Sequence, residues 1–337
     1  MSRVSVLILY NDPVLPPGHP DFDSEHDVLQ TVEMVGAALA DRGFTIDRLG
    51  LKRDPGRLLA RLADGRPDVV FNLFEGLADH GQTEGYVAGL LDWSGVRFTG
   101  CPSEALCIAR SKHLAKYVLR GAGLPTAAFM AIAEVPVPRC SLAWPVIIKP
   151  ALEDGSIGLD QGSVVTDQAS FQARVQYLLN TYGPPVLVEE FVDGREFNVA
   201  VIETPGRRAH VVSEIAFQDH PAGHWRIVTY NAKWKTDSRE FQSTPARCPA
   251  TLSSRENAHL TGLANQAFDL FACRDYARID FRVDASGKTY VIEVNPNPDL
   301  GPDAGLARGL ASIGLTYNQF VVQLVENALE RQPAEKA

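Results

Sequence analysis

The first hundred residues alternate between strand-like and helix-like patterns of apolar positions. The run from Val4 to Tyr10 is apolar apart from Ser5, which is typical of a strand buried on both faces of a parallel sheet. Residues 24–41 carry apolar side chains at helical spacing, with Ser24 as the expected N-cap. The other elements expected here are strands over 45–49 and 68–73 and a helix over 82–93 that stops at Gly95. This order predicts a small doubly wound α/β domain.

The rest of the chain has longer strands and fewer helices. Pro184-Pro185 marks a boundary, and residues 217–250 form the longest irregular stretch. A loop of that length in a compact protein is usually either functional or disordered. The expected elements are a helical pair over 103–122, a strand opening at Pro125, a strand over 144–149, a helix over 171–182, three long strands after residue 185, a helix over 253–271, a hairpin over 278–295 and a helix over 316–331.

The hairpin over 278–295 carries the strongest chemical signal. Arg278 and Asp280 lie two residues apart on its first strand, so their side chains share one face. Glu293 and Asn295 repeat that arrangement on the second strand. Two carboxylates and an amide oxygen beside a guanidinium suit Mg²⁺ that also holds nucleotide phosphates. The alternative is a salt-bridged surface hairpin.

Lys149 ends an apolar strand and is followed by a polar loop that contains Gly155-Ser156-Ile157-Gly158. A lysine in that position is well placed to meet a polyanion, and the glycines allow backbone N–H groups to approach phosphate oxygens. The loop matches neither a P-loop nor a dinucleotide-binding fingerprint. The alternative is an ordinary lysine at the end of a strand, followed by a turn.

The segment from Val186 to Ile202 predicts a site for the base and ribose of a nucleotide. Carboxylates at Glu189, Glu190 and Glu196 are candidates to accept hydrogen bonds from an adenine amino group and a ribose hydroxyl. The backbone from Glu190 through Phe191 to Val192 is a candidate frame for the base. The alternative is a charged hairpin edge that deters aggregation.

Lys233 lies between Tyr230 and Trp234 in the long irregular stretch. This position predicts a lid lysine that closes over phosphate and excludes water, or else an exposed lysine on a mobile loop. His220 and His224 are four residues apart, but Pro221 and Gly223 rule out the helix that would align them for a metal.

Composition and charge narrow the class of protein. The formal net charge is -9 and no Lys/Arg run occurs, which argues against nucleic-acid binding. No apolar run approaches the roughly 20 residues of a membrane span. The five cysteines are scattered and form no CxxC pair, so we expect reduced thiols in a cytosolic protein.

Taken together, the motifs resemble the ATP-grasp superfamily, and within it the D-alanine–D-alanine ligase group. The resemblance runs in order over nearly the whole chain. The segments that carry it are FNLFEGLADHGQTEGYVAGLLDWSGVRFTGC, SKHLAKYVLRGAGLPTAAF, PVIIKPALEDGSIGL, VLVEEFVDGREF, NAKW, ARIDF and IEVNPNP.

The resemblance implies three domains, with ATP held between the second and the third. These are an N-terminal doubly wound domain at 1–100, a central subdomain at 101–184 and a C-terminal catalytic domain of α+β type at 185–333. It also implies an ADP-forming ligase that makes an amide from a small carboxylate and an amine through an acyl phosphate. A homodimer is common among the relatives that the chain resembles.

The resemblance also assigns roles to residues. Lys112 and Lys149 would contact phosphate, with Ser156 in the loop that covers it, and Lys233 would close the site. Glu189 would meet adenine, Glu196 the ribose, and Arg278 the oxyanion. Asp280, Glu293 and Asn295 would hold two Mg²⁺ ions, with Mn²⁺ as a substitute. Glu25 falls where the family anchors the first substrate's ammonium, although it is also an ordinary first-turn acid of a helix.

Departures from the family pattern gather on the amino-acid side of the expected site. Trp234 replaces a tyrosine, and Glu75 replaces a histidine. Gly155 stands where the family has the first of two paired serines. Asp299 stands where the family has a glycine that helps to bind the oxyanion, and the serine that holds the acceptor carboxylate is absent. The acidic side chains of Glu75, Asp299 and Asp303 would repel a carboxylate on the acceptor. They would suit a second amine or a neutral or cationic acceptor.

Three other functions stay open at this point. One is a true D-alanine–D-alanine ligase, and a second is a nucleotide-binding protein without ligase turnover. The third is a ligase that modifies peptides or proteins.

Overall fold

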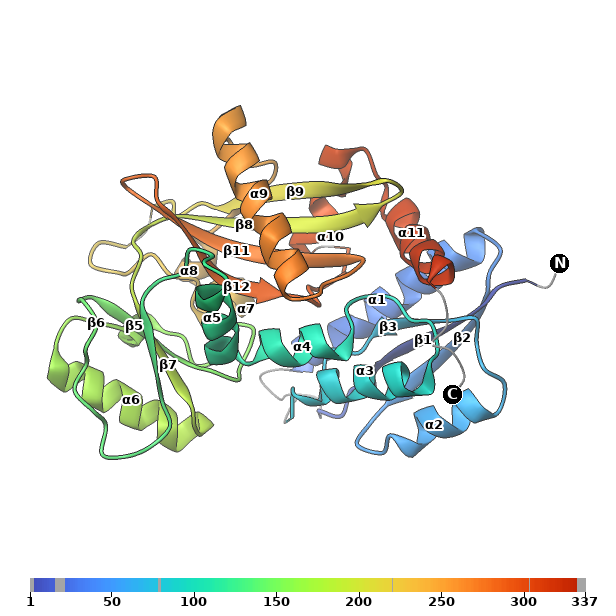
Figure 1. Cartoon of the computed structure of the whole chain (residues 1–337), viewed down its shortest axis with the longest axis horizontal. Helices are drawn as coiled ribbons and strands as arrows, with labels where there is room; N and C mark the ends of the chain where they lie inside the picture. The colour runs from blue at the N-terminus through green and yellow to red at the C-terminus, as the bar shows by residue number, and fades with distance from the viewer. Residues whose placement is uncertain (1–2, 16–21, 78–79, 220, 303, 332–337) are drawn as a thin grey trace.

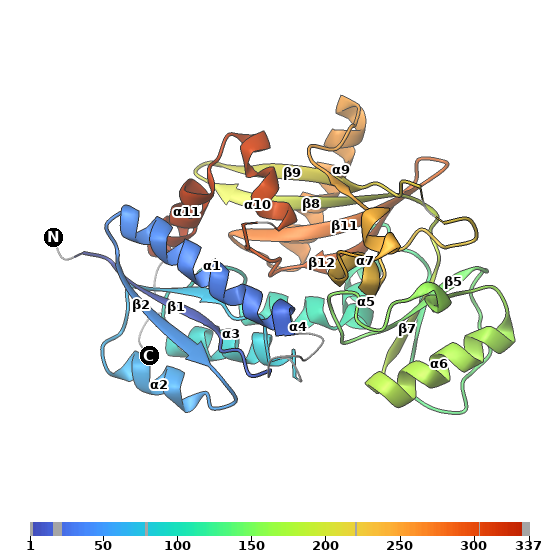
Figure 2. The same cartoon turned by 180° about the vertical axis from the view of Figure 1, so that it is seen from behind.

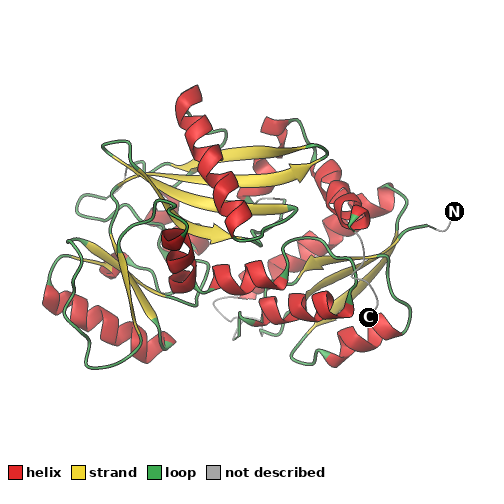
Figure 3. Ribbon diagram, in the orientation of Figure 1, coloured by secondary structure: helices red, strands yellow, loops and turns green. Residues whose placement is uncertain are grey.

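The computed structural model describes residues 3–15, 22–77, 80–219, 221–302 and 304–331, with the backbone alone for 22–25. It contains three sheets, of three, four and five strands (Figures 1 and 3). Within the described residues, none of the helices has the length and apolar character needed to cross a membrane.

The N-terminal sheet is parallel, with β1 (Ser5–Asn11) between β2 (Thr45–Leu51) and β3 (Val69–Leu73). Alternate residues of β1 enter two different cores. Val6 and Ile8 pack with apolar side chains of α1 (Phe22–Asp41) and α11 (Tyr317–Glu330), whereas Leu7 and Leu9 pack with those of α2 (Gly56–Ala63) and α3 (Thr83–Ser94). Helices therefore cover both faces, as Figure 2 shows for α1 and α2, and the predicted doubly wound α/β arrangement is confirmed.

The structure confirms the predicted end of one helix and contradicts the predicted start of another. Gly95 caps α3 in the left-handed conformation, with φ of 59°, as its position at the predicted stop required. The N-cap predicted at Ser24 is wrong, because α1 already begins at Phe22 and Ser24 lies within its first turn.

The four-stranded sheet is antiparallel, in the order β4-β7-β5-β6. Its strands are β4 (Phe129–Ile132), β5 (Val146–Pro150), β6 (Val164–Val165) and β7 (Val186–Glu190), with α6 (Gln168–Tyr182) packed against β5 and β7. The strand expected from Pro125 starts only at Phe129. The predicted boundary at residue 184 needs correction, because β7 pairs with β4 and β5 and the change of sheet therefore falls after Glu190. The division into three domains stays a prediction.

The five-stranded sheet is antiparallel, in the order β10-β9-β8-β11-β12. Its strands are β8 (Gly194–Thr204), β9 (Arg207–Ile215), β10 (Ala246–Arg247), β11 (Tyr276–Asp284) and β12 (Thr289–Asn295). Helix α9 (Ser254–Leu270) begins with a complete capping box between Ser253 and Glu256 and buries its apolar face on this sheet. The hairpin of β11 and β12 sets Arg278 opposite Asn295 and Asp280 opposite Glu293.

Short elements connect these layers. Helices α4 (Ser103–Arg110) and α5 (Lys112–Gly121) lead from the first sheet toward the second. The long irregular stretch contains the short helices α7 (Tyr230–Trp234) and α8 (Arg239–Gln242), and α10 (Gly305–Gly309) follows the hairpin. Two 3₁₀ turns complete the elements, at Gln161–Ser163 and Leu310–Ile313.

Candidate active site

A cavity of about 760 Å³ lies between the four-stranded and five-stranded sheets. It brings together every predicted site residue whose side chain is described. They are Lys112, Lys149, Ser156, Glu189, Glu190, Phe191, Val192, Glu196, Lys233, Arg278, Asp280, Glu293 and Asn295. Glu25 is the exception, because its side chain lies outside the described residues.

The paired strands β11 and β12 form one wall of the cavity. The Arg278 guanidinium donates to both carboxylate oxygens of Asp280, at 2.8 and 2.9 Å. Asp280 also accepts a hydrogen bond of 2.8 Å from the amide of Asn198. Burial would raise the pKa of Glu293, but attraction to Lys112, whose ammonium lies 2.7 Å away, outweighs it and brings the pKa to about 2. Glu293 is therefore ionised throughout the physiological range.

These residues have the donor chemistry that Mg²⁺ prefers. Asp280 and Glu293 face each other across the hairpin, and Asn295 adds an amide beside them. Within the described ranges, no three His, Cys, Asp or Glu side chains gather to hold a metal without other ligands. A site here therefore needs the Asn295 oxygen and further oxygens from a ligand, which suits Mg²⁺ because it is usually bound through one or two carboxylates together with phosphates.

The lysines of the cavity are held in a buried ion-pair network. Glu189 lies between Lys116 and Lys149, with nitrogen–oxygen distances of 2.5 Å to each. The contact with Lys116 is a charge contact, not an aligned hydrogen bond. Burial lowers the pKa of Lys116 despite this pairing, whereas in Glu189 the two lysines outweigh burial and bring the pKa to about 2. The carboxylate predicted to meet adenine is thus already bound by two lysines.

Lys116 was missed by sequence reasoning. Its side chain is only 2% exposed, and the ammonium also donates to Thr126 and to the Val291 carbonyl. The one available signal was its position on α5, four residues after Lys112 and therefore on the same helical face.

The strand end predicted to frame a base is partly occupied by other contacts. The N–H groups of Glu190 and Phe191 donate to the carbonyl oxygens of Ala128 and Pro145, both at 2.9 Å. The Glu190 carboxylate accepts from the N–H of Ala143 at 3.1 Å. These donors are therefore not free for a ligand, and the predicted role of this segment toward the base rests on its carbonyl oxygens.

Glu196 and Arg282 form a buried pair with a nitrogen–oxygen distance of 2.6 Å. Burial raises the pKa of Glu196, and attraction to Arg282 opposes that rise. Arg282 was not identified from the sequence, because its partner lies on another strand and no local spacing connects them. The predicted contact of Glu196 with a ribose stays a prediction.

The two loops expected to cover phosphate contact each other. The Trp234 indole donates to the Gly155 carbonyl at 2.9 Å, and the Ser156 hydroxyl donates to the Val228 carbonyl at 2.9 Å. Lys233 lies with its ammonium 5.2 Å from the centre of the Trp234 ring. Burial, and then repulsion from Arg278, lower its pKa. Helix α7 is thus fastened to the glycine loop, which places Lys233 at the rim of the cavity.

A smaller cavity of about 240 Å³ adjoins the first. Both cavities are bordered by Lys233, Arg278, Glu293 and Asn295. Its far wall includes Glu75 and Asp299, two of the residues that depart from the family pattern, whereas Asp303 lies outside the described residues.

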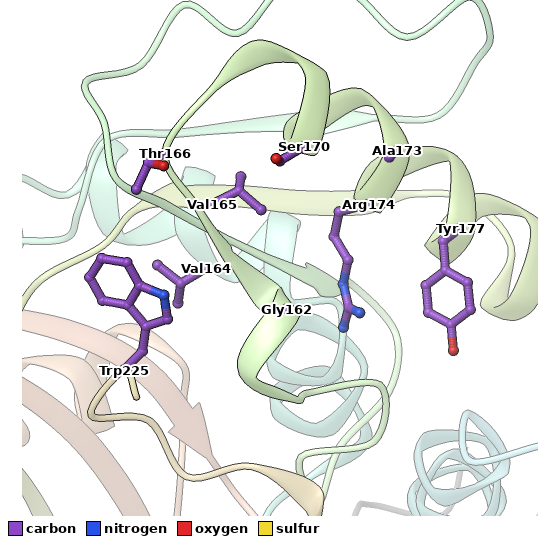
Figure 4. A pocket seen from close by; sticks show the side chains of 9 residues that line it. All are labelled: Gly162, Val164, Val165, Thr166, Ser170, Ala173, Arg174, Tyr177 and Trp225. Carbon is purple, nitrogen blue, oxygen red and sulfur yellow. The ribbon is translucent and has the colours of Figure 1, made fainter. Parts of the chain in front are cut away.

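A third hollow is lined by residues of β6 and α6 and by Trp225. Figure 4 shows Arg174 and Tyr177 of α6 on one side and Trp225 on the other. Arg174 is held by Asp160 at 2.9 Å. This hollow contains none of the predicted site residues.

Comparison with known proteins agrees with this architecture. Residues 118–326 match a family model described as the D-ala D-ala ligase C-terminus. The chain is 32% identical to D-alanine–D-alanine ligase A of Mesorhizobium japonicum, covering 83% of this chain and 77% of that one. It is 30% identical to a D-alanine–D-alanine ligase of Sphingopyxis alaskensis, covering 91% and 95%. A Bacillus anthracis D-alanine–D-alanine ligase solved in complex with ATP superposes with a TM-score of 0.76 at 18% identity, covering 97% of both chains.

The fold is an ATP-grasp fold, as the motifs predicted. The chain belongs to the D-alanine–D-alanine ligase family. It is an ADP-forming carbon–nitrogen ligase that makes an amide bond between small molecules.

Proposed function

We propose that the cavity between the two antiparallel sheets binds ATP and that the protein uses it to join a small amino acid or other carboxylic acid to an amine. The observation that carries this proposal is the shared cavity. Residues predicted from separate segments, among them Lys112, Lys149 and the hairpin carboxylates, line one space of about 760 Å³. A purely structural hairpin would not need distant lysines beside it.

In the proposed reaction, an oxygen of the substrate carboxylate attacks the γ-phosphorus of ATP. The bond to ADP breaks, and an acyl phosphate forms. The amine nitrogen then attacks the acyl carbon, phosphate leaves, and the nitrogen loses a proton. Lys112, Lys149 and Lys233 offset the phosphate charge in a site shielded from water, and Arg278 stabilises the oxyanion.

Asp280, Glu293 and Asn295 would hold Mg²⁺, for which Mn²⁺ can substitute. When bound, the metal supplies positive charge beside the phosphates. Neighbouring side chains hold the two carboxylates in place, because Asn198 and Arg278 bind Asp280 while Lys112 binds Glu293.

The second candidate function is ligation of two D-alanine molecules, which the names of the relatives favour. A panel of amino acids in an ADP-release assay separates the two functions. Highest ADP release with D-alanine as the only substrate would favour the second candidate. Release with other pairs of acid and amine would favour the first. ATP binding without ADP would favour a binding protein, and release only with peptides or proteins would favour a modifying ligase.

Lys149→Ala is expected to weaken ATP binding by at least about tenfold, because a hydrogen bond to a charged group contributes about 1.5–3 kcal/mol. Folding is expected to change little, because Glu189 keeps its second partner, Lys116. Calorimetric titration with Mg-ATP measures the effect, and Lys288→Ala in the exposed hairpin turn is the control. Unaltered ATP affinity would remove Lys149 from the phosphate site.

A cytosolic location and a homodimer are further parts of the proposal. All five cysteines are unpaired, which supports a reducing compartment. On α3, Trp93 is 93% exposed and Tyr86 is 56% exposed, and such an apolar face supports association of two copies. Analytical ultracentrifugation is expected to show a dimer, and a monomer at all concentrations would contradict it.

A further inference from the structure

The glycine loop after β5 contains an acid that contacts the cations of the site. Asp154 precedes Gly155 in this loop and borders both the larger and the smaller cavity. Its carboxylate accepts a hydrogen bond from the ammonium of Lys112 and lies 3.0 Å from the guanidinium of Arg110. Asp154 therefore connects a lysine of the predicted phosphate site to a cation that sequence reasoning did not identify.

The ammonium of Lys112 is already in contact with two protein carboxylates. Glu293 lies 2.7 Å from it, and Asp154 contacts it from the glycine loop. Glu293 is one of the proposed metal ligands, so its charge keeps a partner when Mg-ATP binds. Asp154 is not among those ligands, and phosphate oxygens beside Lys112 would repel its carboxylate. Binding of the nucleotide would therefore favour a position of Asp154 farther from the lysine.

Arg110 is placed to retain that carboxylate. It is the last residue of α4, two residues before Lys112, and its side chain is only 13% exposed. Its guanidinium also lies 3.4 Å from the carboxylate of Glu84, which accepts from the Asn297 amide at 2.7 Å. Arg110 is thus held by α3 and by the segment after β12, so it can keep Asp154 while Lys112 changes its partner.

The neighbouring residues of the glycine loop are held by contacts between neutral groups. The Gly155 carbonyl accepts from the Trp234 indole, and the Ser156 hydroxyl donates to the Val228 carbonyl, both at 2.9 Å. These bonds carry no net charge, so the charge of ATP would affect them less than it affects a carboxylate. Asp154 is therefore the residue of this segment whose contacts depend most on phosphate.

We propose that Asp154 competes with the phosphates of ATP for Lys112, and that Arg110 is a positioning residue that holds the displaced carboxylate and with it the glycine loop. This inference rests on the proposed function, because it requires phosphate to reach Lys112. Asp154 then makes nucleotide binding weaker than the remaining residues of the cavity would allow, and Arg110 limits that loss.

An ion pair that only stabilised the fold would behave differently. Removing either partner would then leave the cavity less well formed, and both changes would weaken nucleotide binding. The side chain of Asp154 is 43% exposed, and ion pairs with an exposed partner contribute little to stability. The two variants of Asp154 and Arg110 are therefore expected to fold.

Calorimetric titration with Mg²⁺ and a non-hydrolysable ATP analogue tests the competition. Asp154→Asn keeps the shape of the side chain and removes its charge, so it is expected to bind the analogue about three- to fivefold more tightly. Asp154→Ser also removes the carboxylate, and it carries the test if Asp154→Asn does not fold. The matched control is Asp64→Asn at the exposed end of α2, outside both cavities, which is expected to leave the affinity unchanged.

Arg110→Gln is expected to change the affinity in the opposite direction. It would weaken binding about three- to fivefold, because the displaced carboxylate loses its second partner. Arg110→Lys keeps the positive charge and is expected to restore most of the affinity. The matched control is Arg255→Gln at an exposed position of α9, which is expected to have no effect. Arg110→Met takes the place of Arg110→Gln if that variant does not fold.

The double variant separates this mechanism from a general effect of charge on the nucleotide. Because Arg110 acts through Asp154, Arg110→Gln is expected to have no further effect once Asp154→Asn is present. A general effect of charge would make the two changes additive. A loss that persists in the Asp154→Asn background would therefore overturn the role assigned to Arg110.

Unchanged or weaker binding in Asp154→Asn would overturn the competition itself. The analogue is titrated first into the unaltered protein, and its failure to bind there would contradict the proposed function instead. Binding to the unaltered protein without the expected gain in Asp154→Asn would contradict only the role of the glycine-loop acid.

Discussion

Glu293→Gln is expected to lower the rate of ADP release by more than about 100-fold. Changes in residues that only support a metal ligand typically cost 10–100-fold, and a direct ligand is expected to cost more. The substitution removes the negative charge that Glu293 would offer to Mg²⁺. It also removes one of the two ion-pair partners of Lys112, which keeps the other, Asp154. The fold is therefore expected to persist while turnover is lost.

A coupled ADP assay measures this effect, and calorimetry with nucleotide in the presence and absence of Mg²⁺ shows whether the metal site is the cause. The matched control is Glu104→Gln, which makes the same substitution at an exposed position in the first turn of α4. Normal turnover in Glu293→Gln would remove this residue from the metal site.

Glu189→Gln is expected to lower the free energy of unfolding by about 3–5 kcal/mol, the cost typical of breaking a buried ion pair from one side. It would leave the ammonium of Lys116, whose side chain is 2% exposed, without its counter-charge. The pKa of Glu189 is lowered to about 2. Its stabilising effect is therefore full above the usual carboxyl pKa of about 4.5 and is lost as the pH falls toward 2.

Urea unfolding at neutral pH measures the loss. The double variant Glu189→Gln with Lys116→Met is expected to recover most of it, because both buried charges of that pair are then gone. Unchanged stability of the single variant would show that the carboxylate is not a structural counter-charge. In that case Glu189 would be free to serve adenine, as the sequence suggested.

Local patterns were sufficient to predict the hairpin and the side chains that it sets opposite each other. Alternation on both strands and a turn with Gly287 predicted that Asp280 and Glu293 would meet, and the register sets them opposite each other. The largely apolar run from Val4 to Tyr10 likewise predicted the buried parallel strand β1. In these cases the signal lies within a few residues, which is the range over which spacing carries information.

The partners of the charged residues could not be predicted in this way. Lys116 and Arg282 neutralise glutamates that lie on other elements, and only the fold brings them together. The boundary at Pro184-Pro185 was misplaced for a similar reason. Prolines end the helix α6, but they do not prevent the next strand, β7, from returning to the same sheet.

The most direct test is a crystal structure with Mn²⁺ and a non-hydrolysable ATP analogue, with the metal located by anomalous scattering. We predict a manganese peak beside Asp280, Glu293 and Asn295, with the phosphates reaching Lys112 and Lys149 in the cavity between the two antiparallel sheets. Nucleotide and metal bound elsewhere on the protein, with this cavity empty, would contradict the account.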